Sequence, residues 1–312
     1  MSKLIGAVCV GLALAAPAAA QERVTYKSAK AGSSYYQMGV ELAEAMRAGT
    51  DGAISVTVEE SQGSVQNVME ARARGADYVF TTPPGLVAAA QAGTGPFEGK
   101  GNPAFAEVRA LFPIPSLTMH FVMDAETGAE TLADMAGRTI LLGSGSFGAT
   151  EGETYLELFG IEAEIADAEL SNAVGALKNG QIDGFVTAGS WPAPNVIEAA
   201  ATMPVTILSM TDEQVAETGR TRLEIPAGTY AGQDAPIVTT ALDVVAFATT
   251  KMPEDTAYTL TRTFWEEQAR LADAARWWAG IAPEMLQGAG VEIHPGALRY
   301  YEEIGAEVGA EG

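Results

Sequence analysis

The sequence predicts an α/β protein built from two lobes of similar size. From Arg23 onward, short β-type runs alternate with runs of helical period, which is typical of a parallel sheet with helical crossovers. The pattern restarts after a proline-punctuated segment, residues 113–116, which indicates a second unit. A third apolar run, residues 241–249, then precedes a long helical region, residues 255–278, so we expect the chain to return and complete the first lobe. Two such crossings would create a hinged cleft.

Each expected element has its own pattern. Ile54, Val56 and Val58 alternate with polar residues as in a strand, whereas Met38 and Leu42 recur at helical spacing. On such patterns we expect strands at 24–28, 54–58, 76–81, 119–123, 139–142, 182–187, 205–208 and 241–249. We expect helices at 35–48, 65–74, 85–92, 132–136, 150–159, 173–178, 196–201, 255–278 and 296–304. The expected lobes are residues 21–117 with 236–312, and residues 118–235.

The first twenty residues have the pattern of a secretory signal peptide. Lys3 precedes an apolar run, residues 4–16, and small residues end at Ala20. We expect cleavage after Ala20 and a periplasmic location. Because the single cysteine, Cys9, lies in this segment, the mature chain is expected to contain neither disulfides nor reactive thiols.

The charge of the chain restricts its partners. The formal net charge is −22 at pH 7, and such a surface repels nucleic acid and anionic lipid. It also repels small anions at long range. An anionic ligand would therefore need local groups that overcome this field.

Four predicted loops follow strands and precede helices: residues 30–34, 61–64, 143–148 and 190–194. In an open parallel sheet such loops lie at the carboxyl edge of the strands, where ligands bind. Each leads into a helix N-terminus, whose free N–H groups and dipole favour a carboxylate or phosphate. The sequence therefore predicts a small anionic ligand held between the lobes.

The candidate ligand-binding residues lie in or near these loops. They are Ser33, Ser34, Tyr35, Tyr36, Ser64, Asn67, Thr82, Ser144, Ser146, Phe147, Thr150, Ser190 and Trp191. Each hydroxyl residue also has a simpler interpretation as a helix N-cap. Consecutive residues of a helix point about 100° apart, so one of the two tyrosines is expected to face the cleft. Trp191 could form a wall for the ligand's carbon skeleton or lie on the lobe surface.

Enzymatic interpretations have less support. Residues 143–148 match G-x-G-x-x-G, but a dinucleotide site is disfavoured because the motif lies mid-chain in a chain predicted to be exported. The two histidines, His120 and His294, lack partners at metal-ligand or triad spacing. With no paired-carboxylate signature either, we expect a binding protein without catalytic residues, metal or cofactor.

Five phrases of the sequence, taken together, resemble one family. They are residues 32–36 with Gly39, residues 63–67, residues 132–137 running into 143–146, residues 225–230, and residues 294–297 with Tyr300 and Tyr301. In this order they resemble the TAXI-type solute-binding proteins of TRAP transporters, over nearly the whole mature chain.

This resemblance implies a type II periplasmic binding fold and delivery of a ligand to a membrane permease driven by an ion gradient. Family ligands include glutamate, glutamine and 2-oxoglutarate, and by position the resemblance gives the ligand-binding role to Tyr35, Ser64, Asn67, Ser144 and Ser146. The chain departs from the family at residues 82–84 and at Trp191, so a larger or aromatic acid stays an alternative. A sensor that docks a signalling protein is a further alternative. We expect a monomer.

Overall fold

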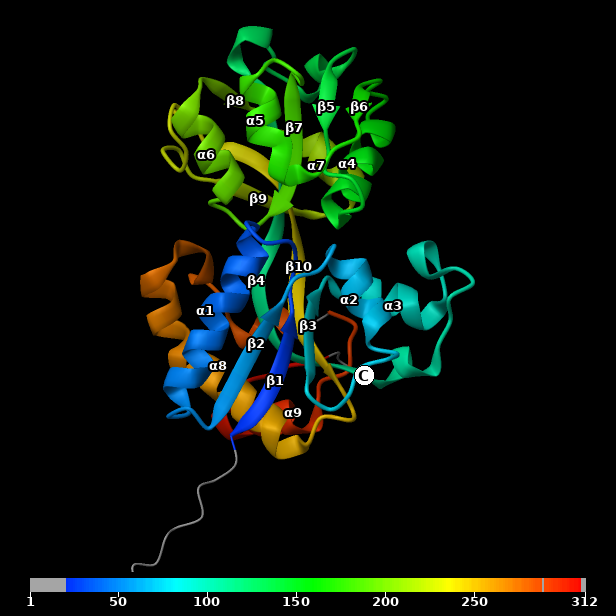
Figure 1. Cartoon of the computed structure of the whole chain (residues 1–312), viewed down its shortest axis with the longest axis vertical. Coiled ribbons are helices and arrows are strands. Elements are labelled where there is room, and N and C mark those ends of the chain that lie inside the picture. The colour runs from blue at the N-terminus through cyan, green and yellow to red at the C-terminus, as the bar shows by residue number, and fades with distance from the viewer. Residues whose placement is uncertain (1–20, 288, 310–312) are drawn as a thin grey trace, which may run out of the picture.

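Two α/β lobes are joined by a narrow waist of strands in the computed structural model, which describes residues 21–287 and 289–309 (Figure 1). The predicted signal peptide lies outside the described residues. Lobe 1, at the bottom of the view, contains the first three strands and the C-terminal helices. Lobe 2, at the top, is formed by the middle of the chain. Within the described ranges, no helix combines the length and apolar character required to cross a membrane.

One sheet order runs through both lobes, β2-β1-β3-β10-β4-β7-β5-β6, with β8 added beside β4 and β9 beside β10. The strands are β1 (Glu22–Lys27), β2 (Ile54–Glu59), β3 (Tyr78–Thr82), β4 (Val108–Asp124), β5 (Thr139–Leu141), β6 (Glu164–Ala166), β7 (Gly184–Gly189), β8 (Val205–Ile207), β9 (Thr221–Ile225) and β10 (Ile237–Thr249). In each lobe the outer pairings are parallel, as expected for strands joined by helices.

Helices flank these strands in both lobes. Lobe 1 has α1 (Ser34–Gly49), α2 (Ser64–Glu70), α3 (Pro84–Ala92), α8 (Glu254–Ala274) and α9 (Pro295–Ile304). Lobe 2 has α4 (Phe147–Leu158), α5 (Ala173–Lys178), α6 (Pro194–Thr202) and α7 (Asp212–Thr218). Short 3₁₀ turns connect them. The alternation of strand and helix agrees with the α/β class that the sequence predicts.

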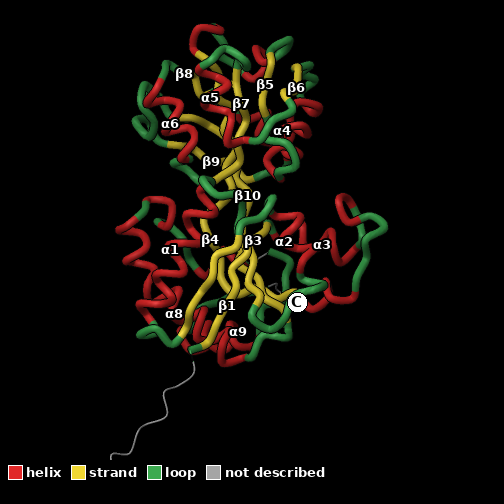
Figure 2. Tube along the Cα trace, in the orientation of Figure 1, coloured by secondary structure: helices red, strands yellow, loops and turns green. Residues whose placement is uncertain are grey.

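The waist consists of β4 and β10, two long antiparallel strands that continue from one lobe into the other (Figure 2). Residues 113–116, after which the sequence pattern restarts, lie inside β4. Pro113 and Pro115 are tolerated there because the β4–β10 pairing changes register close by, between Leu242 and Val244. Prolines occur in sheets at such irregularities, where one ladder N–H is not needed.

The pairing partners of β10 also locate the second crossing. Residues 237–241 pair with β9 of lobe 2, whereas residues 245–247 pair with β3 of lobe 1. Ile237 belongs to the hydrophobic core of lobe 2. We therefore propose that lobe 2 extends to about Leu242, beyond the boundary after residue 235 that the sequence suggested.

Other differences are local. The helix expected at 65–74 ends at Glu70, and the one expected at 255–278 ends at Ala274, with a 3₁₀ turn beyond it. Strands β6 and β9 and helix α7 were not expected. The two short strands carry few buried apolar residues, so their hydrophobic pattern is weak.

Candidate ligand-binding site

A cavity of about 490 Å³ lies between the two lobes. Loops at the ends of β1 and β2 and the start of α1 line it from lobe 1. From lobe 2 it is lined by the start of α4, the loop after β6, the end of β7 and the start of α6. Strand β10 contributes Val244 at its base. The volume lies in the range of sites for small organic molecules, and both lobes enclose it.

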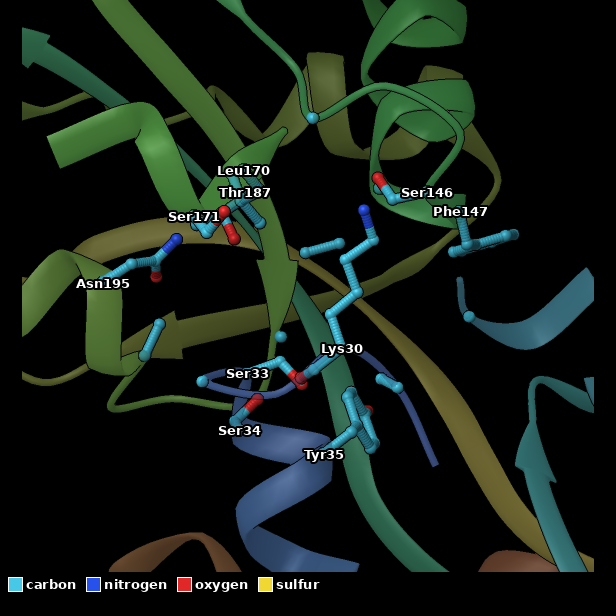
Figure 3. A pocket seen from close by; sticks show the side chains of 18 of the residues that line it. Lys30, Ser33, Ser34, Tyr35, Ser146, Phe147, Leu170, Ser171, Thr187 and Asn195 are labelled. Carbon is cyan, nitrogen blue, oxygen red and sulfur yellow. The ribbon is translucent and has the colours of Figure 1, made fainter. Parts of the chain in front are cut away.

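The N-terminus of α1 forms the lobe 1 side of the cavity (Figure 3). Ser33 caps the helix, accepting a hydrogen bond from the Tyr36 N–H at 3.2 Å. The Ser34 Oγ accepts from the Ser190 N–H at 3.1 Å, which ties α1 to the end of β7. The Tyr35 hydroxyl donates to the Pro115 carbonyl at 2.9 Å, and burial raises its pKa above the usual range, so it stays protonated.

The N-terminus of α4 lies on the lobe 2 side of the cavity, opposite the N-terminus of α1. Ser146 caps this helix by accepting from the Ala149 N–H at 3.0 Å, and Phe147 presents its ring to the cavity. Across the cleft, Gly63 lies near the Phe147 backbone, since a Cβ on Gly63 would be in ordinary van der Waals contact with the Phe147 nitrogen, at 3.8 Å. Two helix N-termini of at least three turns therefore meet at one cavity, each with a serine cap. The N–H groups of the first turn of a helix and its dipole favour an anion at such a place.

Charged residues of the lining come from both lobes. Among the described residues that line the cavity, Lys30 is the one cation. The carboxylates of the lining belong to Glu60, Glu169 and Glu198. The Lys30 side chain reaches from the lobe 1 loop into the cavity toward lobe 2 and forms an ion pair with Glu169 (Figure 3). Glu60 accepts a hydrogen bond from the Ala31 N–H at 3.0 Å, which holds the same loop.

Six of the thirteen residues proposed from the sequence line the cavity: Ser33, Ser34, Tyr35, Ser64, Ser146 and Phe147. Tyr36 does not, because it follows Tyr35 on the helix and points elsewhere. Thr150 is exposed on the outer side of α4. Ser144 turns away and donates to Asp167 Oδ1 at 2.6 Å, which fixes the glycine loop to the loop after β6.

Four further proposed residues have structural roles outside the lining. Asn67 is fully buried and donates to the carbonyls of Ser28 and Thr81, so its amide holds the ends of β1 and β3 together. Thr82 is buried on β3, where alternation brings its neighbour Thr81 to the cavity instead.

Ser190 Oγ donates to the Ser116 carbonyl at 2.8 Å, which joins the end of β7 to β4. Trp191 packs against the hydrophobic core of lobe 2 and is not among the lining residues.

Several lining residues were missed from the sequence: Glu169, Leu170, Ser171, Thr187 and Asn195. Three of these belong to the loop between β6 and α5, which was not recognised because β6 itself was not. The same order of strand, loop and helix that marks the other cleft loops occurs here too. It consists of residues 164–166, a polar loop, and the helical run that begins at Ala173. That order is the signal that could have identified them.

A buried hydrogen-bond chain supports the lobe 2 wall of the cavity. The Ala193 N–H donates to the Tyr230 hydroxyl at 2.9 Å, and this hydroxyl lies 2.8 Å from His120 Nε2. His120 Nδ1 lies 3.3 Å from the Thr118 carbonyl, which requires a proton on Nδ1 and makes Nε2 the acceptor from Tyr230. These hydrogen bonds therefore hold the start of α6 in place, and they require His120 to be neutral.

This histidine makes stability depend on pH. Burial lowers the pKa of His120 to about 4, below the value of 6.5 for an unperturbed histidine. Between these values the unfolded chain binds a proton that the folded protein does not, so the free energy of unfolding falls as pH falls. We expect His120 to contribute a loss of up to about 3 kcal/mol between pH 7 and pH 4.

Urea unfolding at a series of pH values checks this effect. The protein is compared with a His120→Gln variant, whose side chain can still donate and accept but does not titrate. The difference between their unfolding free energies should narrow as the pH falls below 6.5. A constant difference across this range would contradict the expected titration.

Solved structures with the same architecture include several periplasmic proteins. BugD, a periplasmic binding protein, aligns with a TM-score of 0.55 at 15% identity, covering 93% of this chain and 99% of that one. MatC from Rhodopseudomonas palustris, solved with bound malate, aligns with a TM-score of 0.58 at 13% identity, covering 91% and 97%. A structure described as a periplasmic transporter gives 0.52 at 13% identity, covering 92% and 93%. The fold is the two-lobed type II fold of periplasmic binding proteins.

The sequence itself matches one family over most of its length. Residues 27–305 match the model of the NMT1-like family. The chain belongs to this family, and the matched range spans both lobes and the cavity between them.

Proposed function

We propose that this chain is an exported, periplasmic solute-binding protein that captures a small carboxylate between its lobes and delivers it to a membrane permease. Its membership of the NMT1-like family and its fold support a binding role. The phrases that resemble TAXI-type proteins make a TRAP transporter the proposed partner, with glutamate, 2-oxoglutarate or a related organic acid as ligand. We propose that the protein acts as a receptor and not as an enzyme, without a cofactor and as a monomer.

The observation that carries this proposal is the composition of the cavity wall. Ser33 and Ser34 at the start of α1 and Ser146 at the start of α4 place hydroxyl groups and helix N-termini on opposite sides of one interlobe cavity. Lys30 adds a cation at the same place. These groups supply the local positive potential that a chain with net charge −22 needs in order to bind an anion.

The aromatic-acid alternative receives less support, since Trp191 packs on the lobe 2 core. Phe147 and Tyr35 are then the aromatic side chains that the described lining offers to an apolar part of the ligand. MatC, which shares the fold, was solved with malate, so a short dicarboxylate belongs among the first compounds to test.

A thermal-shift screen tests the binding role. Wild-type protein is heated with 2-oxo acids, dicarboxylates including malate, amino acids and aromatic acids. A ligand that binds only the folded protein at 100 times its Kd stabilises it by about 2.7 kcal/mol, so Tm should rise and should follow ligand concentration. The acid should be recovered chemically unchanged, as judged by NMR. If none of these acids raises Tm, the proposed function is wrong.

Two variants of α4 locate the binding site. Ser146→Ala removes a lining hydroxyl and should reduce the ligand-induced rise in Tm, measured from the variant's own ligand-free Tm. Thr150→Ala, one turn further along the same helix and exposed, should retain the full rise. Equal rises in both variants would argue that the ligand does not contact the start of α4.

A further inference from the structure

Lys30 and Glu169 form an ion pair that crosses the cleft inside the cavity. Lys30 belongs to the loop between β1 and α1 in lobe 1, and Glu169 to the loop between β6 and α5 in lobe 2. Both residues line the cavity proposed to hold the ligand. The pair therefore joins the lobes at the place where the ligand would bind, so a ligand must either avoid it or replace one partner.

The two partners differ in exposure, which indicates which one is replaced. The Lys30 side chain is 23% exposed, while the Glu169 side chain is 50% exposed. Glu169 can turn its carboxylate to solvent at little cost. Lys30 projects into the cavity, where an unpaired cation would be unfavourable once a ligand excludes water.

Among the described residues that line the cavity, Lys30 is the one whose charge can attract a carboxylate. Among the described residues that line the cavity, the other charged side chains are Glu60, Glu169 and Glu198, all of which repel an anion. A ligand carboxylate that approached the helix N-termini without reaching Lys30 would still face these carboxylates. Pairing with Lys30 releases one of them, Glu169, from the site.

We propose that Lys30 binds the carboxylate of the ligand and that Glu169 occupies this position when the cavity is empty. The inference rests on the proposed function and adds to it a specificity-determining residue and an internal competitor. Ligand binding exchanges one carboxylate for another on Lys30. A ligand must therefore bring at least one carboxylate, and its affinity reflects the cost of displacing Glu169.

Binding measurements on three variants test the exchange, with the acid that gives the largest Tm rise in the screen as the probe. Lys30→Met should weaken binding by about tenfold to a hundredfold, the usual effect of losing a hydrogen bond to a charged group. Glu169→Gln should strengthen binding several-fold, because the competitor is removed. In the double variant, Glu169→Gln should add little to Lys30→Met, since Glu169 acts through Lys30.

The control is Glu213→Gln, which removes one negative charge from lobe 2 at an exposed position of α7, away from the cavity. It should leave the affinity at the wild-type value. If Glu169→Gln and Glu213→Gln strengthen binding equally, the effect comes from net charge and the inference is overturned. Equal affinities of the wild type and all three variants would overturn it too.

A second measurement needs no ligand. Spin labels at Val40→Cys on α1 and Leu158→Cys on α4, both exposed and on different lobes, report the distance between the lobes in the mature chain, which is expected to contain no other cysteine. In the ligand-free protein, Glu169→Gln should lengthen or broaden this distance, whereas Glu213→Gln should not. Unchanged distances would contradict a bridging role for the pair. A screen in which no acid stabilises the wild type would instead overturn the proposed function, and with it the ligand role of Lys30.

Discussion

Replacing Gly148 by valine is expected to abolish tight ligand binding. Gly148 lies in the first turn of α4 and contacts β7, and a Cβ at this position would lie 2.8 Å from the Cβ of Ala188 and 3.2 Å from its nitrogen. Ala188 is held in the sheet by pairing with Met119 of β4, so α4 has to move. The movement displaces Ser146 and Phe147 from the cavity. We expect affinity to fall at least about tenfold and stability by about 1–3 kcal/mol.

Isothermal titration with the acid identified by the screen measures the loss of affinity. A matched control is Gly175→Val on α5, in the same lobe, where an added Cβ meets no atom within 4 Å. That variant should bind like the wild type. If Gly148→Val also binds normally, the start of α4 does not form the ligand site.

The largest loss of stability is expected for Gly296→Val. Gly296, in the first turn of α9, touches the backbone at the start of α8. A Cβ there would lie 2.0 Å from the Glu254 carbonyl oxygen and 2.9 Å from the Tyr258 nitrogen. Backbone atoms cannot rotate away as a side chain can, so the two helices must separate. We expect the free energy of unfolding to fall by more than about 3 kcal/mol, above the usual range for overpacking.

Urea unfolding followed by circular dichroism measures this loss. Gly85→Val is the matched control, because Gly85 also lies early in a lobe 1 helix, α3, and has open space around it. It should change stability by less than about 1 kcal/mol. A small effect of Gly296→Val would show that α8 and α9 can shift apart without cost.

Much of the fold could be predicted because its signals are local. The alternation of Ile54, Val56 and Val58 and the helical spacing of Met38 and Leu42 each depend on a few neighbouring residues, and both elements form where expected. The sequence did not show that Pro113 and Pro115 lie inside one long strand, because their tolerance there depends on how β10 pairs alongside, more than a hundred residues later. Long-range register leaves no mark in a short window of sequence.

The sequence could predict which loops and helix caps form the candidate site. It could not predict which side chains of those loops point into the cavity. Ser144 and Ser146 lie in the same glycine loop with equivalent chemistry, yet Ser146 caps α4 at the cavity and Ser144 bonds to Asp167 behind it. The Lys30–Glu169 pair joins loops from different lobes. Its partners meet only once both lobes have formed, so no spacing in the sequence could indicate it.

The position of β10 has a consequence for the order in which the protein can assemble. In the sheet of lobe 1, β10 lies between β3 and β4, although it follows both in the chain, with the whole of lobe 2 in between. During synthesis, which starts at the N-terminus, lobe 2 can therefore fold before lobe 1, because lobe 1 still lacks its middle strand, β10. Until residues 245–249 arrive, β3 and β4 have no shared neighbour, and α8 and α9 follow later still. Lobe 1 depends on contacts of high sequence separation, which favours slow folding. Its strands therefore stay unpaired for a long time, during which the unfolded chain can still be translocated across a membrane or bound by a chaperone.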